Sequence, residues 1–525
     1  FGNFNDADYF KKKDLSVTNS MTFFNIYDLE DIKSPSLIKE FKFEGNYFNA
    51  RLIDNHVYFV SSQYPNSREI PMPLIIEDDI ARNVKIGNVF FYNINYDHVN
   101  FMSVHSINMD QIKNTDSITV AVESGQNMYM SFDNLYITYT QRINEYELQQ
   151  DILKDLLQSK LSESDIELIK KINSADNDIL NSYEKESKIM QIYYGYLYQL
   201  DSNEQETIQE NAEEMLLKKL EEYDYLEFTV INQINVNDGK ITLGKNGNVP
   251  GRIINQFSMD QSNNIFRIAT TLSARWSRFG KERTESTNNV FTLDMDMNIL
   301  DSIKEIAPGE SIFSTRFIGD KLYMVTFEQV DPFFVIDLSN PKDIEILGKL
   351  KIPGFSRYLH PYDENTIIGI GRDATDTGRT KGLKISLFDV SEFDNPKEIA
   401  QFVTDEKYAQ STALYEHKAF LFSKEKNMLV IPAYSHEYDN RYGEGKGYNG
   451  AFVFHITKEE IELRGLIDHS MSNNNYWSNL VERSLYIEEL LYTKSPTLLR
   501  INQIDTLESV KNIDLVTDNS DFEIY

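Results

Sequence analysis

The chain has no cysteine among its 525 residues. This absence excludes disulfides, thiolate nucleophiles, iron–sulfur clusters and zinc sites built on cysteine. Glycine and proline are scarce, at 23 and 13 residues, which excludes collagen-like and proline-rich chains. No apolar run approaches the roughly 18 residues of a membrane-spanning helix, so we expect no transmembrane segment. The sequence starts at Phe1 without a visible signal peptide, which fits a trimmed chain and a mature exported chain equally well.

Basic residues are also fewer than acidic ones. Lysine and arginine number 52 against 82 aspartates and glutamates, a net charge of −30. A surface this acidic repels phosphate backbones, so we expect no nucleic-acid partner. The length and the 41% hydrophobic content suffice for a large core in several domains or in one large ring of repeats.

Proline is missing between Pro73 and Pro250, and the hydrophobic period changes within that gap. Residues 145–226 have the spacing of amphipathic helices, whereas nearly all other segments have the pattern of strands. We therefore predict a helical insertion at 145–226, which divides a β-protein into residues 1–144 and 227–525.

Helix boundaries within the insertion are indicated by capping residues. Ser164 and Glu167 fit a capping box, another helix is expected over 183–200, and a third after Asp201 or Ser202. We expect the aromatic stripe of the insertion to pack on its host; a partner-binding surface is the alternative.

Internal repeats dominate the rest of the chain. Residues 48–60 (FNARLIDNHVYFV) and 313–325 (FSTRFIGDKLYMV) share five of thirteen positions, among them Arg51 and Arg316. Each piece is a strand, a polar turn and a second strand, the pattern of a hairpin. We expect the two arginines to occupy equivalent positions on the first strand of each hairpin.

A second repeated element is an apolar strand that ends in an acid, followed by a turn and another strand. The acids recur rather than appearing once, so we interpret them as turn-forming carboxylates, not catalytic groups. They are Asp28, Asp294, Asp337 and Asp389.

Together, a hairpin and two further strands make a four-stranded unit of about 40 to 50 residues, the size of a propeller blade. We predict an all-β propeller of eight blades, with seven as the alternative, interrupted by the α-helical insertion. Because closure removes exposed edges, the first residues are expected to pair with the last blade or its neighbour.

The stretch 317–371 resembles a family of secreted archaeal and bacterial proteins with a C-terminal β-propeller distantly related to WD repeats. Residues 382–396 (GLKISLFDVSEFDNP), 417–432, 250–260 and 44–60 extend the likeness. The resemblance implies a propeller and an extracellular or cell-surface location. It implies no particular reaction or ligand.

Few residues carry recognisable chemistry. His360, with Asp363 and Glu364 close behind it in LHPYDEN, is a candidate channel or loop site, as is His417; a turn histidine is the competing interpretation for both. Asp373 and Asp376 surround a glycine turn and offer oxygen ligands for calcium, without EF-hand spacing. Calcium is the one cofactor that we expect.

Catalytic motifs are missing from the sequence. No HExxH, GxSxG or Walker A pattern occurs. This favours a secreted or surface binding or scaffold protein, whose partners are proteins or glycans at the cell surface. The alternative is an extracellular hydrolase or other enzyme with a site at the central channel of the propeller.

Overall fold

The computed structural model describes residues 1–13, 15, 21–64, 72–92, 99–113, 115–176, 179–274, 284–327, 331–352, 354–375, 379–436, 447–470 and 479–515. Contacts divide the chain into two compact units. Unit 1 consists of Phe1–Arg252, Leu272–Thr284 and Met295–Asn298, and unit 2 of Ile253–Thr271, Glu285–Asp294 and Ile299–Tyr525.

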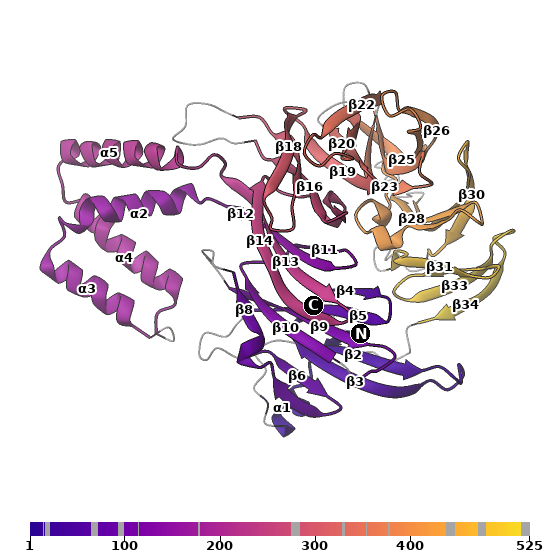
Figure 1. Cartoon of the computed structure of the whole chain (residues 1–525), viewed down its shortest axis with the longest axis horizontal. Coiled ribbons are helices and arrows are strands. Elements are labelled where there is room, and N and C mark those ends of the chain that lie inside the picture. The colour runs from indigo at the N-terminus through magenta and orange to yellow at the C-terminus, as the bar shows by residue number, and fades with distance from the viewer. Residues whose placement is uncertain are drawn as a thin grey trace, which may run out of the picture. The chain divides into compact units, whose positions relative to one another are not determined.

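Eight β-sheets form from the described parts of the chain (Figure 1). Six of them have four strands in chain order, the meander of a propeller blade, and the other two have five. This confirms the all-β fold with eight blades.

The first three sheets lie in unit 1. Their strands are β1 (Gly2–Phe4), β2 (Met21–Asp28), β3 (Ser36–Glu44), β6 (Leu74–Glu77) and β7 (Ile80–Asn83); β4 (Asn46–Ile53), β5 (His56–Gln63), β9 (Asn100–Asn108), β10 (Thr115–Val122) and β8 (Val89–Phe91); and β11 (Asn127–Met130), β12 (Asn134–Arg142), β13 (Glu227–Asn237) and β14 (Lys240–Pro250).

The remaining sheets belong mainly to unit 2. Their strands are β15 (Met259–Ser262), β16 (Ile265–Leu272), β17 (Thr287–Leu293) and β18 (Ile299–Ile306); β19 (Ser311–Ile318), β20 (Lys321–Phe327), β21 (Asp331–Asp337) and β22 (Glu345–Ile352); β23 (Phe355–Pro361), β24 (Thr366–Ala374), β25 (Thr380–Asp389) and β26 (Lys397–Val403); β27 (Leu421–Ser423), β28 (Met428–His436), β29 (Gly447–Ile456) and β30 (Ile461–Asp468); and β31 (Arg483–Ile487), β32 (Leu490–Lys494), β33 (Leu498–Gln503) and β34 (Ser509–Asp514).

Of the two expected pairings of the first residues, with the last blade or with its neighbour, pairing with the last blade is wrong. Strand β1 pairs antiparallel with β2, and every described strand of the last sheet comes from β31–β34. The physical reason lies in the aromatic residues of the N-terminal segment. Phe4 and Phe10, the latter on helix α1 (Ala7–Lys12), pack against Met21 and Leu74 of their own sheet. Burial of these apolar rings stabilises the N-terminal segment on the first sheet.

The repeat predicted around Arg51 and Arg316 is confirmed. In β4 the residue Phe48 is an extra residue in the pairing with β5, and in β19 the residue Phe313 is extra in the pairing with β20. Such an extra residue is a β-bulge, which re-aims the side chains that follow it. Three residues later, Arg51 lies opposite Tyr58 and Arg316 opposite Tyr323.

The repeated acids at strand ends behave as turn formers at three of the four predicted positions. Asp28, Asp337 and Asp389 each accept, through Oδ1, a hydrogen bond from the backbone N–H two residues later, at 2.9, 3.0 and 2.9 Å. A carboxylate in this position closes a turn by replacing a backbone acceptor. Their recurrence therefore reflects architecture.

The helical insertion consists of four helices between two paired strands of one sheet. Arg142 at the end of β12 lies opposite Glu227 at the start of β13, so the helices leave and rejoin a continuous strand pair. They are α2 (Glu145–Gln158), α3 (Glu163–Ser174), α4 (Ser182–Leu197) and α5 (Ser202–Leu220).

Capping explains where the helices begin. Asn181 and Glu184 form the capping box of α4, and Asp201 caps α5 as predicted. The predicted cap at Ser164 is wrong, because Ser162 caps α3 by accepting from the N–H of Asp165. The N-cap therefore lies two residues earlier than predicted, at Ser162, whose backbone is extended.

Three tyrosines of the insertion, Tyr193, Tyr194 and Tyr196, pack within the insertion and not on its host, contrary to expectation, whereas Tyr183 and Tyr198 are exposed. The three belong to one apolar cluster with Leu157 and Ile172, and a second cluster includes Ala212 and Leu216. Among the described residues, both clusters contain only side chains from the insertion. Figure 1 shows the four helices gathered as one group. No helix of the described chain is long and apolar enough to cross a membrane.

Candidate functional site

Segments distant in the sequence meet at the first strands of the unit 2 sheets. Strand β19 contacts β23 and the short 3-10 helix η2 (Gln256–Ser258). A second short helix, η3 (Thr412–Leu414), contacts β23, and η4 (His417–Ala419) contacts β31. First strands that gather in this way are the inner elements of a propeller, where loops and side chains of several blades converge.

Arg316 on β19 is the central charge of this region. Its guanidinium lies over the ring of Phe257, 4.8 Å from the ring centroid. It makes no hydrogen bond or ion pair within the part of the chain that the structure describes. Burial lowers the pKa of Arg316, and nearby Tyr358 and Asp260 oppose that shift. Asp260 is itself ion-paired with Arg267, so it does not neutralise Arg316 alone.

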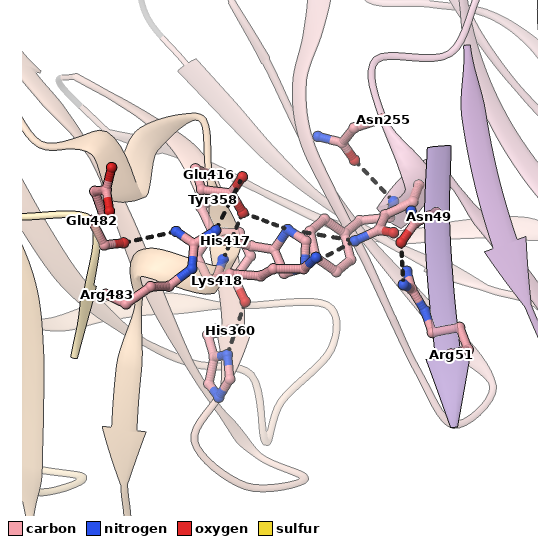
Figure 2. Close-up of polar contacts among 12 residues, drawn as sticks. Asn49, Arg51, Asn255, Tyr358, His360, Glu416, His417, Lys418, Glu482 and Arg483 are labelled. Carbon is pink, nitrogen blue, oxygen red and sulfur yellow. Dashed lines mark hydrogen bonds and ion pairs between the residues drawn. The ribbon is translucent and has the colours of Figure 1, made fainter. Parts of the chain in front are cut away.

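His360 on β23 lies beside this arginine. The Tyr358 hydroxyl is 3.1 Å from His360 Nδ1, and Figure 2 shows the phenol directed at the imidazole. Burial, with a smaller contribution from the charge of Arg316, lowers the pKa of His360 to about 4. The ring is therefore neutral at physiological pH and offers a hydrogen bond rather than a charge.

His417 reaches the same region from η4. Its Nε2 is 3.2 Å from Nε2 of Gln256, and its ring contacts Phe257 edge-on at 5.0 Å between centroids. Phe257 also packs against Tyr358, with centroids 5.5 Å apart. The structure therefore connects His360 and His417 through two intervening rings, those of Tyr358 and Phe257. We call this group the Arg316 cluster; it comprises Gln256, Phe257, Arg316, Tyr358, His360 and His417.

The two carboxylates predicted near His360 do not join it. Asp363 accepts a hydrogen bond from the N–H of Asn365 at 3.0 Å and pairs with Lys424 at 3.3 Å. Burial alone would raise the pKa of Asp363, but these contacts outweigh it and hold the pKa below its usual value. Glu364 is exposed on the same turn. Of the three candidates in LHPYDEN, only His360 therefore belongs to the Arg316 cluster, whereas Asp363 and Glu364 form part of a turn.

Asp373, one of the two predicted calcium ligands, is engaged by a lysine. Lys381 Nζ lies 3.0 Å from its Oδ2, at an open pocket of about 450 Å³ that Lys384 and Glu398 also line. Asp376 lies outside the described residues. Within the described ranges, no group of three or more histidines and carboxylates could hold a metal ion.

Arg51 shows that position alone does not make the site. It has the same place in its sheet as Arg316, but its Nη1 donates to Asn49 Oδ1 at 2.7 Å (Figure 2). The same Nη1 donates to the Ala50 carbonyl at 2.8 Å. Its donors are already used by its own strand. The open guanidinium is therefore a property of Arg316 and its surroundings in unit 2.

Sequence reasoning missed most of the cluster. Arg316 was noticed only as a repeated architectural residue, and Phe257 and Tyr358 carry no motif. The signal available in the sequence is the arginine itself, repeated in the Phe-x-x-Arg-x-Ile frame of a chain of net charge −30. The arrangement supplies charged donors, a neutral imidazole and aromatic faces, which together suit an anionic ligand with an apolar part.

Comparisons with known proteins agree with this architecture. A family model described as a beta propeller domain matches residues 2–507. An uncharacterized protein of Methanocaldococcus jannaschii is 31% identical over 497 residues, which cover 93% of this chain and 72% of that protein. An uncharacterized protein of Archaeoglobus fulgidus is 29% identical over 464 residues, covering 85% of this chain and 69% of that protein. The chain therefore belongs to the beta propeller domain family.

Proposed function

We propose that this chain is a binding protein of the cell exterior or cell surface and that the Arg316 cluster holds an anionic group of its ligand. The observation that carries the proposal is the Arg316 guanidinium, which has no acceptor within the described residues of a strongly acidic chain. A partly buried arginine is costly unless an anion or aromatic ring accompanies it. Phe257 covers one face, and the N–H edge remains for a ligand.

A carboxylate is the anion that best fits these donors. The guanidinium fork matches two oxygens of one carboxylate, while Gln256 and the histidine rings can contact neighbouring hydroxyl groups. Proteins and glycans at a cell surface both carry carboxylates, so they are the partner classes that we propose. A protein of net charge −30 repels anions at long range. The affinity for an anion must therefore come from short-range contacts with the Arg316 cluster.

The test uses the purified chain and D-galacturonate in isothermal titration calorimetry, with D-galactose as the uncharged control of the same ring. We expect galacturonate to bind and galactose to bind at least about tenfold more weakly, since a charge-assisted pair contributes about 1.5–3 kcal/mol. Arg316→Gln should abolish the difference. Equal binding of both sugars, or unchanged galacturonate binding by Arg316→Gln, would contradict the proposal.

The matched control is Arg483→Gln. Arg483 also belongs to a first strand, but its guanidinium already contacts Glu416 at 3.8 Å and the Glu482 carbonyl at 2.7 Å (Figure 2). Removing this satisfied charge should leave galacturonate binding unchanged. Circular dichroism and melting curves of both variants establish that each is folded.

The location outside the cytoplasm rests on the resemblance to exported proteins. Fractionation of cells that produce the native protein tests it. We expect recovery from the surface or medium fraction, and recovery from the cytosol alone would overturn this part of the proposal.

A further inference from the structure

Arg357 is a second arginine of unit 2 whose donors are open. It is the extra residue of the bulge in β23, and its guanidinium lies over the rings of Phe313, Phe355 and Tyr415, at 4.7, 5.6 and 5.2 Å from their centroids. It makes no hydrogen bond or ion pair with any residue that the structure describes. The neighbours of this cation are therefore aromatic rings, and its N–H donors are available to a ligand.

The neighbour of Arg357 is another cation, not an acid. Arg372 donates to the carbonyls of Lys381 and Lys407 at 3.2 and 3.0 Å, and its buried Nε has no partner among the described residues. Burial lowers the pKa of Arg372; repulsion from Arg357 adds to this effect, while two tyrosines oppose it. In the described chain, no carboxylate forms an ion pair with either arginine.

The two open guanidiniums come from neighbouring first strands, β19 and β23, which contact each other. Arg357 lies over the ring of Phe313, which comes three residues before Arg316 on β19. Each guanidinium has aromatic neighbours of its own, Phe257 for Arg316 and Phe313 and Tyr415 for Arg357. We therefore treat the two arginines as separate binding points, each for one carboxylate of the same molecule.

We infer that Arg316 and Arg357 bind two separate carboxylates of one acidic glycan, with a sugar ring on the open face of Tyr415. This inference rests on the proposed function. Tyr415 is 71% exposed, and Arg357 covers one of its faces. The C–H face of a pyranose is apolar and weakly positive, so it suits the negative face of an aromatic ring.

The charge of the chain narrows the class of glycan. A net charge of −30 repels a long polyanion, because the repulsion grows with every charged unit of the ligand. A short glycan that carries two or three carboxylates loses less to this repulsion. The ligand is therefore a short glycan of uronic acids, not a long phosphate backbone.

The experiment measures calorimetric affinities of the full chain for D-galacturonate, trigalacturonate and a tripeptide with glutamate at both ends. We expect trigalacturonate to bind at least about tenfold more tightly than the monosaccharide, because its second carboxylate binds intramolecularly. Arg357→Gln should reduce this gain to less than about threefold and leave galacturonate unchanged. Arg316→Gln should reduce galacturonate to the affinity of galactose and remove the gain of trigalacturonate over galacturonate.

The outcomes separate this inference from the proposed function. If trigalacturonate has no advantage, or keeps it in Arg357→Gln, the two-site inference is wrong while a single anion site at Arg316 stands. If the tripeptide binds more tightly than the sugar in an Arg316-dependent way, the glycan class is wrong and the anion site again stands. If no ligand depends on Arg316, both are wrong.

Two further variants guard against misfolding. Tyr415→Ala removes an exposed ring without changing charge, and it should weaken trigalacturonate more than the tripeptide. Arg357→Lys keeps the positive charge but loses the stacking of the planar guanidinium and its paired N–H donors. It should therefore keep only part of the affinity advantage of trigalacturonate over galacturonate that Arg357→Gln removes. An unchanged sugar preference in Tyr415→Ala would overturn the placement of a sugar ring on this residue.

Discussion

Arg316 and His360 occupy the same position in two neighbouring sheets. Each is the third residue after a bulge in the first strand of its sheet, the bulge residues being Phe313 and Arg357. The sequence comparison aligned only Arg51 with Arg316, because a histidine at the third position shares no identity with an arginine. The common register explains why both side chains lie in the same region, and the charge of Arg316 in turn contributes to the low pKa of His360.

Excising the helical insertion should leave a folded β-protein. Ile143 N–H donates to the Leu226 carbonyl at 2.9 Å, and Arg142 lies opposite Glu227, so the strand ends are already adjacent. An Asn-Gly turn between residues 143 and 226 can join them, because two-residue turns fit antiparallel hairpins. Circular dichroism and a cooperative urea transition provide the measurement.

The matched control for this excision breaks the strand junction itself. Arg142→Ala in the shortened chain removes the ion pair of 2.6 Å with Glu227 and should lower the free energy of unfolding by about 1–3 kcal/mol, because the buried carboxylate loses a partner. A shortened chain without a cooperative transition would show that the helices belong to the β-core.

Acid should destabilise the protein before its carboxylates titrate. Burial lowers the pKa of His105 to about 3, with a smaller contribution from Arg82, and lowers the pKa of His469 to about 4, with Arg500 adding to the shift and Asp468 opposing it. Unfolded histidines bind protons near pH 6.5, so the unfolded chain takes up protons that the folded chain refuses. The free energy of unfolding is therefore highest above about pH 6.5 and falls toward about pH 4.

Urea denaturation across this range, with His105→Leu for comparison, checks the histidine origin. His105 Nε2 is buried without a partner in the described chain, and Nδ1 lies 2.9 Å from the Ser117 hydroxyl, so leucine removes one hydrogen bond and one proton site. The variant should lose about 2 kcal/mol less than the wild type over the same pH interval. Identical pH slopes would contradict this assignment.

The strand-ending aspartates should stabilise the fold through their turn hydrogen bonds, and Asp337 provides the test. Its carboxylate accepts from the N–H and hydroxyl of Ser339, each at 3.0 Å, and pairs with Lys321 at 2.8 Å. Asp337→Ala should lower the free energy of unfolding by about 1–3 kcal/mol, since the lysine and the turn N–H lose their acceptor. Asp343→Ala, an exposed aspartate after the same turn, is the control and should change it by less than about 0.5 kcal/mol. Equal effects in urea denaturation would refute the turn role.

Calcium remains a proposal for the turn that begins at Asp373. A bound ion would have to displace Lys381, because the lysine already lies 3.0 Å from the carboxylate. We therefore expect a small rise in melting temperature with calcium, reversed by a chelator, and a larger rise in Lys381→Met. Equal melting temperatures with calcium and chelator in both proteins would remove calcium as a ligand of this turn.

The sequence by itself determined the local elements of this protein. Alternating apolar residues, polar turns and strand-ending acids such as Asp337 specify hairpins through interactions within a few residues, and capping residues such as Asn181 start helices in the same way. These features predicted eight sheets and a helical insertion, because a repeated local pattern needs no long-range information.

Only the tertiary structure decided which side chains meet. Phe257, Arg316 and Tyr358 are separated by tens of residues, and a single-residue bulge sets the direction in which each first strand presents them. The same register that leaves Arg316 open gives Arg51 acceptors on its own strand, although the two repeats are nearly alike. Whether an arginine finds a hydrogen-bond acceptor depends on the residues that tertiary packing places beside it. The repeat therefore could not predict that Arg316 and Arg357 have no acceptor among the described residues.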